Sequence, residues 1–96
     1  MPRRKKVYVI GSLCQEMAIM NIVNRISKTS DVRYVYKKSV KNFSEIASEN
    51  FANIEWADVV IAVPQFDGTF SSGTSYEIEY AKRIGKRVIV AKKDWM

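Results

Sequence analysis

The chain has 96 residues, of which 47% are hydrophobic and 27% are charged, so it suits one folded domain and is too short for two separate cores. It contains no histidine and one cysteine, Cys14, which excludes a Ser-His-Asp triad, a structural zinc site and an internal disulfide. The longest apolar run, 59–64, is far shorter than the roughly 20 residues of a membrane span, and we expect a cytoplasmic protein.

Sixteen lysine and arginine residues against ten acidic residues give a net charge of +6. Four of the basic residues fall within 3–6, and we expect residues 1–6 to form a basic arm at the start of a single domain over 1–96. The others are spread over predicted element ends and helix faces, without the alternating aromatic residues of surfaces that stack bases. The charge therefore favours a small anionic ligand, and we expect neither a nucleic-acid face nor a membrane contact.

Strand-like and helix-like patterns alternate from the start of the chain. The β-branched and aromatic run 7–10 predicts a strand that ends at Gly11-Ser12, and the apolar spacing from Gln15 onward predicts a helix. The stretch 31–36 has an extended pattern but is charged and aromatic, which is typical of an edge strand.

The second half of the chain continues the alternation. A helix is predicted to begin near Asn42, and its apolar face includes one polar residue, Asn50, which needs a partner or a ligand. The run 58–63 is apolar without alternation, which indicates a strand covered on both faces. A polar loop, a helix over 74–84 and a strand over 87–91 follow.

This order of elements predicts an α/β fold of the flavodoxin-like or Rossmann-like kind, a three-layer sandwich with helices on both faces of a small parallel sheet. With four strands the expected order is 2-1-3-4. Ligands of such sheets bind beyond the carboxyl ends of the strands, so we expect the loops 11–15 and 64–73 to meet over one cleft. Their glycines and hydroxyl side chains suit an anion at a helix amino terminus.

Glu77 is the best nucleophile candidate because it comes soon after the cleft loop, in the predicted first turn of the third helix. The same spacing fits a capping box in which Glu77 accepts the backbone N–H of Thr74, and spacing alone favours that structural role. Tyr8 fits either the core or the cleft. The pair Asp67-Gly68 is interpreted as a turn rather than as a second catalytic carboxylate.

Four segments together resemble the nucleoside 2-deoxyribosyltransferases and the related 2'-deoxynucleoside 5'-monophosphate N-glycosidases. The segment 71–81 contains the pattern Gly-Thr-x-x-Glu-x-x-Tyr-Ala, which is moderately specific. The segments 57–62 and 85–89 are common in α/β proteins, and Val-Tyr-Val-Ile-Gly-Ser at 7–12 completes the set. In this order they are distributed between residues 7 and 89.

The resemblance implies that Glu77 attacks the anomeric carbon of the sugar and that Tyr8 helps to position its carboxylate. Serine at position 71 is typical of relatives that bind a 5'-phosphate, whereas nucleoside-using relatives carry an acid there. The substrate-binding set implied in this way is Gly11, Ser12, Leu13, Ser71 and Gly73.

Asn50 departs from the family pattern. It stands where relatives carry an aspartate that helps to protonate the departing base, and an amide cannot deliver that proton. Asn53 is an alternative match if the alignment gap is moved. We keep Asn50 as a catalytic candidate that contacts the base or the sugar.

The expected activity is that of an N-glycosidase or 2-deoxyribosyltransferase acting on (deoxy)nucleoside 5'-monophosphates through a covalent glycosyl-glutamate intermediate, with no metal or other cofactor. The alternative is a non-catalytic module of the same fold that binds or sequesters nucleotides. The aromatic surfaces of the second and third predicted helices also predict a homodimer or higher oligomer.

Overall fold

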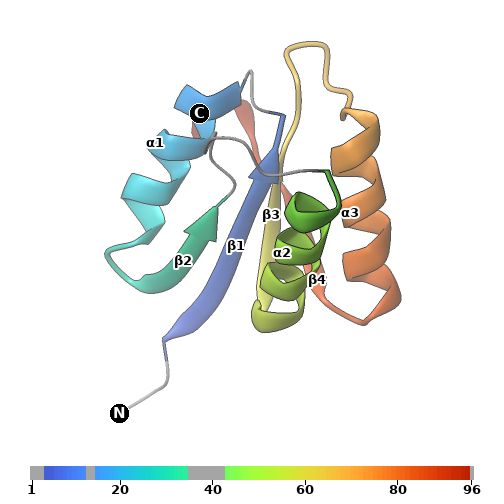
Figure 1. Cartoon of the computed structure of the whole chain (residues 1–96). Coiled ribbons are helices and arrows are strands. Elements are labelled where there is room, and N and C mark those ends of the chain that lie inside the picture. Colours follow the sequence, from blue (N-terminus) through green and yellow to red (C-terminus); the bar gives the residue numbers. More distant parts are fainter. Residues whose placement is uncertain (1–3, 13–14, 35–42, 96) are drawn as a thin grey trace.

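The computed structural model describes residues 4–12, 15–34 and 43–95, and of residues 43–47 the backbone alone. Strands and helices alternate through these ranges, as predicted (Figure 1). The elements are β1 (Lys5–Gly11), α1 (Glu16–Ile26), β2 (Ser30–Tyr34), α2 (Phe43–Trp56), β3 (Val59–Val63), α3 (Ser72–Arg83), β4 (Arg87–Val90) and a 3-10 turn, η2 (Lys93–Trp95).

The four strands form one parallel sheet in the order β2-β1-β3-β4. In the centre, Val9 of β1 lies between Tyr34 of β2 and Ile61 of β3. The apolar run of β3 is buried along its whole length, whereas β2 is an edge strand, as its charged sequence predicted. The predicted α/β class and strand order are therefore confirmed.

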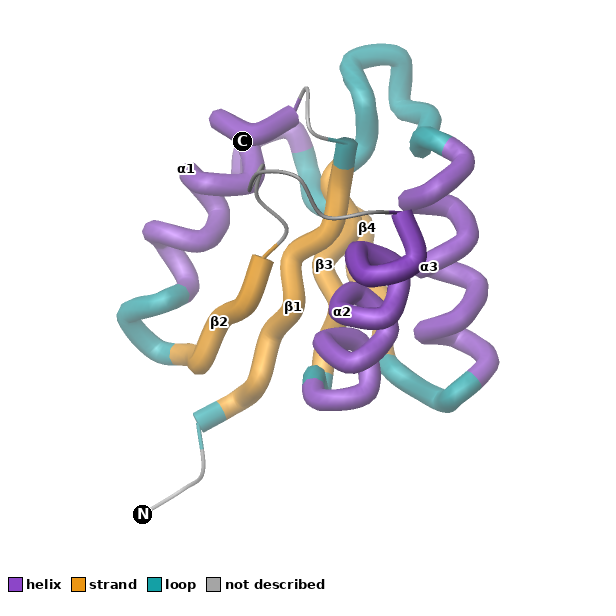
Figure 2. The backbone as a smooth tube through the Cα atoms, viewed as in Figure 1, coloured by secondary structure: helices purple, strands orange, loops and turns teal. Residues whose placement is uncertain are grey.

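Helices cover both faces of the sheet, with α1 on one side and the α2–α3 pair on the other (Figure 2). Because successive strand side chains point to opposite faces, β1 and β3 each supply both halves of the core. The α1 half contains Val7, Val9, Ile19, Ile22, Val23, Val59, Ile61 and Val63, and the α2–α3 half contains Tyr8, Ile10, Ile54, Ala57, Val60, Ala62, Ile78 and Ala81. Tyr8 thus faces the two helices that carry Asn50 and Glu77.

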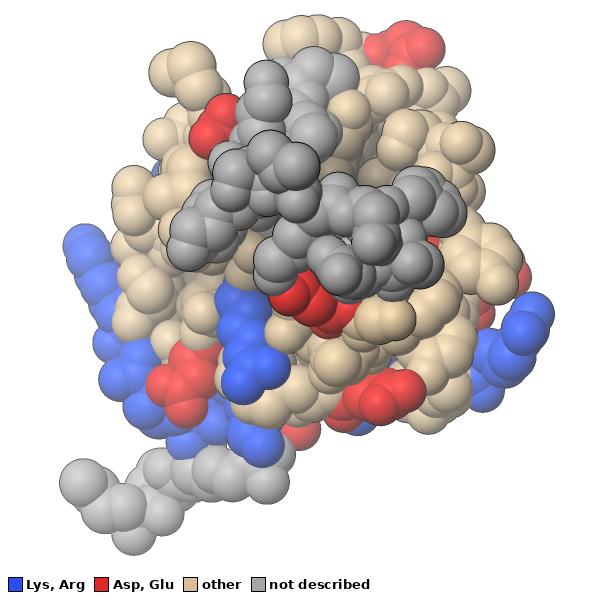
Figure 3. All heavy atoms as spheres, viewed as in Figure 1, with Lys and Arg blue, Asp and Glu red and all other residues tan. Residues whose placement is uncertain are grey.

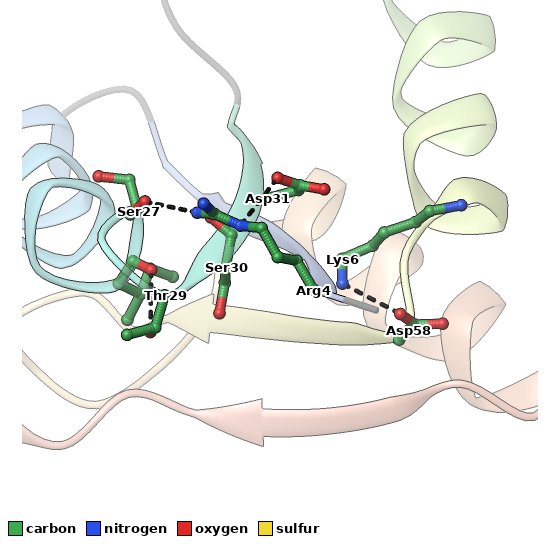
Figure 4. Close-up of polar contacts among 8 residues, drawn as sticks. Arg4, Lys6, Ser27, Thr29, Ser30, Asp31 and Asp58 are labelled. Atoms are coloured by element: carbon green, nitrogen blue, oxygen red, sulfur yellow. Dashed lines mark hydrogen bonds and ion pairs between the residues drawn. The ribbon is translucent and has the colours of Figure 1, made fainter. Parts of the chain in front are cut away.

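The start of β1 is tied to the neighbouring chain segments, which corrects the expectation of a basic arm over residues 1–6. Lys5 and Lys6 belong to β1, and the Lys6 backbone N–H donates to Asp58 Oδ2 over 3.0 Å (Figure 4). The Arg4 guanidinium donates to the carbonyls of Ser27 and Ser30 and pairs with Asp31. The first three residues lie outside the described ranges.

Several element boundaries differ by one or two residues from those predicted. β2 begins at Ser30 and β4 ends at Val90, each one residue earlier than expected. α3 begins at Ser72 instead of 74, because the hydroxyl of Ser71 caps it. Residues 35 and 36 and the predicted helix start at Asn42 lie outside the described ranges. Within those ranges, no helix combines the length and the apolar character that a bilayer crossing requires.

Candidate active site

Two hydrogen bonds in series join the three residues that the sequence singled out as catalytic candidates. The Tyr8 hydroxyl on β1 donates to Asn50 Oδ1 on α2 over 3.1 Å, and Asn50 Nδ2 donates to Glu77 Oε1 on α3 over 2.9 Å. We call this chain the Tyr8–Asn50–Glu77 relay. It gives Asn50 the polar partners that its place in an apolar stripe required.

The chemistry of the two outer groups fixes the orientation of the amide between them. Tyr8 is 0% exposed. Burial, together with the nearby Glu77 carboxylate, raises the pKa of the Tyr8 hydroxyl above its usual range. The hydroxyl therefore stays protonated and acts as a hydrogen-bond donor. An ionised carboxylate can only accept. Asn50 therefore turns its oxygen toward Tyr8 and its nitrogen toward Glu77.

Glu77 is a carboxyl group whose protonation changes near neutral pH. Burial raises its pKa from 4.5 to about 7, while the hydrogen bond from Asn50 acts in the opposite direction. A buried carboxyl with a pKa close to the working pH is typical of acid, base and nucleophile roles. Asn50 bonds to Oε1, so this contact does not engage Oε2.

Glu77 does not cap α3, so the capping-box interpretation was wrong. The N-cap is Ser71, whose hydroxyl accepts the backbone N–H of Thr74 over 3.3 Å. With α3 starting at Ser72, Glu77 falls in the second turn, beyond the first N–H groups that a capping carboxylate would accept. Its carboxylate lies against α2 instead.

The amino end of α3 carries a hydroxyl pair. Ser71 Oγ and Thr74 Oγ1 lie 2.9 Å apart, and a Cβ added at Gly73 would meet nothing within 4 Å. The first backbone N–H groups of a helix lack partners within the helix and favour an anion there. Ser71 precedes Glu77 by six residues, or about 9 Å along a helix axis.

Gly11, a predicted substrate-binding residue, is needed for packing. A Cβ at this position would lie 3.2 Å from Ile19 Cδ1 and 3.2 Å from both Val63 Cβ and the Val63 carbonyl oxygen. The next residue, Ser12, uses its carbonyl to accept the backbone N–H of Gln15 at the turn into α1. Leu13 lies outside the described residues.

Asn53, the alternative match to the family aspartate, is placed differently from Asn50. Its Oδ1 accepts from the Arg33 guanidinium over 3.0 Å, and that guanidinium lies 4.1 Å from the centre of the Trp56 ring. Asn50, one turn earlier on α2, is the residue that bonds to Glu77.

The loops that follow β1 and β3 meet, as predicted, but around residues that the sequence analysis had not singled out. A hollow of about 420 Å³ lies between them, and a larger hollow of about 680 Å³ extends over the start of α1. Phe66 lines both hollows and is 94% exposed. The loop has two aromatic residues, Phe66 and Phe70, and Phe70 packs against the core whereas Phe66 does not. Both hollows are separate from the Tyr8–Asn50–Glu77 relay.

The pair Asp67-Gly68 forms a turn, as predicted. Asp67 Oδ1 accepts from both the backbone N–H and the hydroxyl of Thr69, and these bonds lower the pKa of the Asp67 carboxyl. Gly68 has a φ of 83°, which favours glycine. The Asp67 carboxylate is therefore occupied within its own loop.

Charge is unevenly spread over the face shown in Figure 3, where basic side chains gather around the amino-terminal end of β1 with acidic side chains among them. Within residues 4–12, 15–34 and 43–95, no three Cys, Asp or Glu side chains are grouped closely enough to hold a metal ion.

The fold and the relay together define a small parallel α/β protein with a partly buried carboxylate held between two helices. No protein-family model matches the sequence, and the search of curated proteins gives no significant match. Among solved structures, the chain is similar to the Clostridium botulinum CMP N-glycosidase, BcmB, with a TM-score of 0.65 and 23% identity over 90% of this chain and 70% of that one. This likeness confirms the predicted fold.

Proposed function

We propose that this protein is an N-glycosidase that acts on nucleoside 5'-monophosphates, with Glu77 as the nucleophile. The observation that carries the proposal is the Glu77 carboxyl itself, which is partly buried, is held by Asn50 of α2 and is raised by burial to a pKa of about 7. The fold similarity to a CMP N-glycosidase supports the same reaction class.

In the proposed reaction, Glu77 Oε2 attacks C1' of the bound nucleotide. The bond from C1' to the carboxylate oxygen forms while the bond from C1' to the base nitrogen breaks, and the base leaves with the electron pair of that bond. Water then opens the glycosyl ester, which returns the carboxylate and retains the configuration at C1'. If a second base takes the place of water, the same site acts as a 2-deoxyribosyltransferase.

The 5'-phosphate is assigned to the amino end of α3, where Ser71 and the exposed Gly73 lie. Backbone N–H groups and hydroxyls bind a phosphate dianion without a compensating charge, because a helix amino terminus already carries a partial positive charge. The net charge of +6 favours the approach of such an anion.

A second candidate function is a nucleotide-binding or sequestering module without turnover. Asn50 supports it, because the amide cannot deliver a proton to the departing base and is held on both sides by Tyr8 and Glu77.

The decisive experiment incubates the protein with a panel of nucleoside 5'-monophosphates and measures free base by chromatography. We expect base release in the parent and its loss in Glu77→Gln, with nucleotide binding still measurable. Glu79→Gln, a matched change at an exposed glutamate two residues later on α3, should keep the activity. A parent that releases no base, yet gains melting temperature with nucleotide, selects the sequestering module.

A further inference from the structure

The relay gives Asn50 a task that differs from base protonation. Its amide oxygen is taken by the Tyr8 hydroxyl and its amide nitrogen by the Glu77 carboxylate. Three separate elements, β1, α2 and α3, hold these groups, so their geometry is set by the packing of both helices on the sheet. An amide held at both ends is suited to orienting its neighbour.

We propose that Asn50 is a positioning residue for Glu77: its amide, which the Tyr8 hydroxyl holds in one orientation, keeps the Glu77 carboxylate ionised and aimed for attack. This inference rests on the proposed function and specifies how its nucleophile is prepared. It also means that the base departs without a proton from residue 50.

The physical reason is that burial and hydrogen bonding act on Glu77 in opposite directions. Burial favours the neutral carboxyl, which is a poor nucleophile, whereas an N–H donor bonds best to the ionised oxygen. Among the residues whose side chains the structure describes, the titratable groups that act on the relay are Tyr8 on β1 and Glu49 on α2, and neither is basic. Within this set, the amide of Asn50 is the group that favours the ionised Glu77 carboxylate.

Tyr8 acts through Asn50 because a free amide could rotate. If Asn50 turned by half a rotation, its oxygen would face the Glu77 carboxylate and the two acceptors would repel each other. The Tyr8 hydroxyl prevents this, since it is fully buried and keeps its proton to donate to the amide oxygen. The relay thus assigns a function to a hydroxyl that lies inside the core.

The test measures base release against pH, with CMP as the first probe, for the parent, Tyr8→Phe and Asn50→Leu. We expect activity in the parent to rise through a pH of about 7, where Glu77 ionises. A hydrogen bond to a charged group, when lost, moves such a midpoint by about one pH unit or more, so both variants should have higher midpoints and about tenfold lower activity at pH 7. Tyr80→Phe is the matched control, because its hydroxyl donates to Glu55 Oε1 outside the relay, and its profile should equal that of the parent.

The double variant Tyr8→Phe with Asn50→Leu tests whether the two residues act in series. If Tyr8 acts only through Asn50, the double variant should be no slower than Asn50→Leu alone. Losses that multiply, or a Tyr8→Phe profile that coincides with the parent profile, would overturn the relay.

A second readout keeps the relay testable without turnover. The pKa of the Glu77 carboxyl, followed by carbon NMR in labelled protein, should rise in Asn50→Leu and in Tyr8→Phe and stay unchanged in Tyr80→Phe. Unchanged values in all three variants reject the relay. If the variants show the expected pKa shifts but the parent releases no base, the enzymatic function is rejected and the relay remains a property of the site.

Discussion

Asn50 Nδ2 lies 2.9 Å from Glu77 Oε1, although the two residues belong to different helices and are 27 positions apart. At this distance an amide stabilises a carboxylate, whereas an aspartate in the same place would face it with a second negative charge. The ionisation of the proposed nucleophile therefore depends on a residue that another helix supplies. Stability and activity should both respond to this pair.

The first prediction concerns stability against pH. The pKa of Glu77 rises from 4.5 to about 7 on folding, so the folded state favours the protonated carboxyl. The contribution of this carboxyl group to the free energy of unfolding is complete below pH 4.5. It is lost as the pH rises through 7, and the loss is on the order of 3 kcal/mol. Urea unfolding between pH 4.5 and 8 should show this loss in the parent and a flatter curve in Glu77→Gln. If the free energy of unfolding of the two proteins depended equally on pH, the raised pKa of Glu77 would be contradicted.

The second prediction concerns Asn50→Asp. Two carboxyl groups at this separation share one proton, so the variant holds an acid beside the nucleophile. General acid catalysis typically contributes about 10² to 10⁴ fold, and base release should rise if proton delivery limits the parent. The rate should also become bell-shaped in pH, because the doubly ionised pair lacks the acid. A profile that keeps rising at high pH would show that residue 50 does not reach the base.

The third prediction concerns the phosphate. Ser71→Asp keeps an N-cap of comparable strength on α3, so the helix should remain intact, while Ser71→Ala should cost about 1 kcal/mol of stability. An added carboxylate about 4 Å from a phosphate repels it by about 4 kcal/mol at an effective dielectric constant of about 20, before relaxation. Calorimetry should therefore show weaker monophosphate binding and a relative gain for free nucleosides. Equal monophosphate affinity would place the phosphate elsewhere.

The fourth prediction compares two glycines. Gly11→Ala brings a methyl group to 3.2 Å from the Val63 backbone oxygen, and overpacking of this kind typically costs about 1 to 3 kcal/mol. Gly73→Ala enters open space in the first turn of α3 and should stabilise the fold by about 0.5 to 1 kcal/mol. Urea unfolding measures both. A neutral Gly11→Ala would mean that the end of β1 moves freely away from β3.

The fifth prediction concerns self-association. Part of the aromatic surface of α2 and α3 is packed within the chain. The centre of the Phe51 ring lies 4.5 Å from the centre of the Tyr80 ring and 5.8 Å from that of the Tyr76 ring. Tyr76 remains 67% exposed beside Glu77. We expect a homodimer or higher oligomer by light scattering at micromolar concentration, and Tyr76→Ser should weaken it. A monomeric mass for the parent would contradict this expectation.

The sequence by itself determined the alternation of elements, the parallel sheet with its central and edge strands, and the need of Asn50 for a polar partner. These features depend on residue periodicity and on local turn chemistry, which neighbouring residues reveal. The spacing pattern around residue 77 also found the proposed nucleophile, through its resemblance to a known family.

Only the tertiary structure decided which serine or threonine caps α3 and what Glu77 contacts. Ser71 and Thr74 are both good caps, and the small difference between them depends on how the preceding loop leaves β3. The pKa of Glu77 follows from its burial between α2, α3 and β1, and the relay joins residues 42 and 27 positions apart. Such contacts arise when separate elements pack together, so no local pattern contains them.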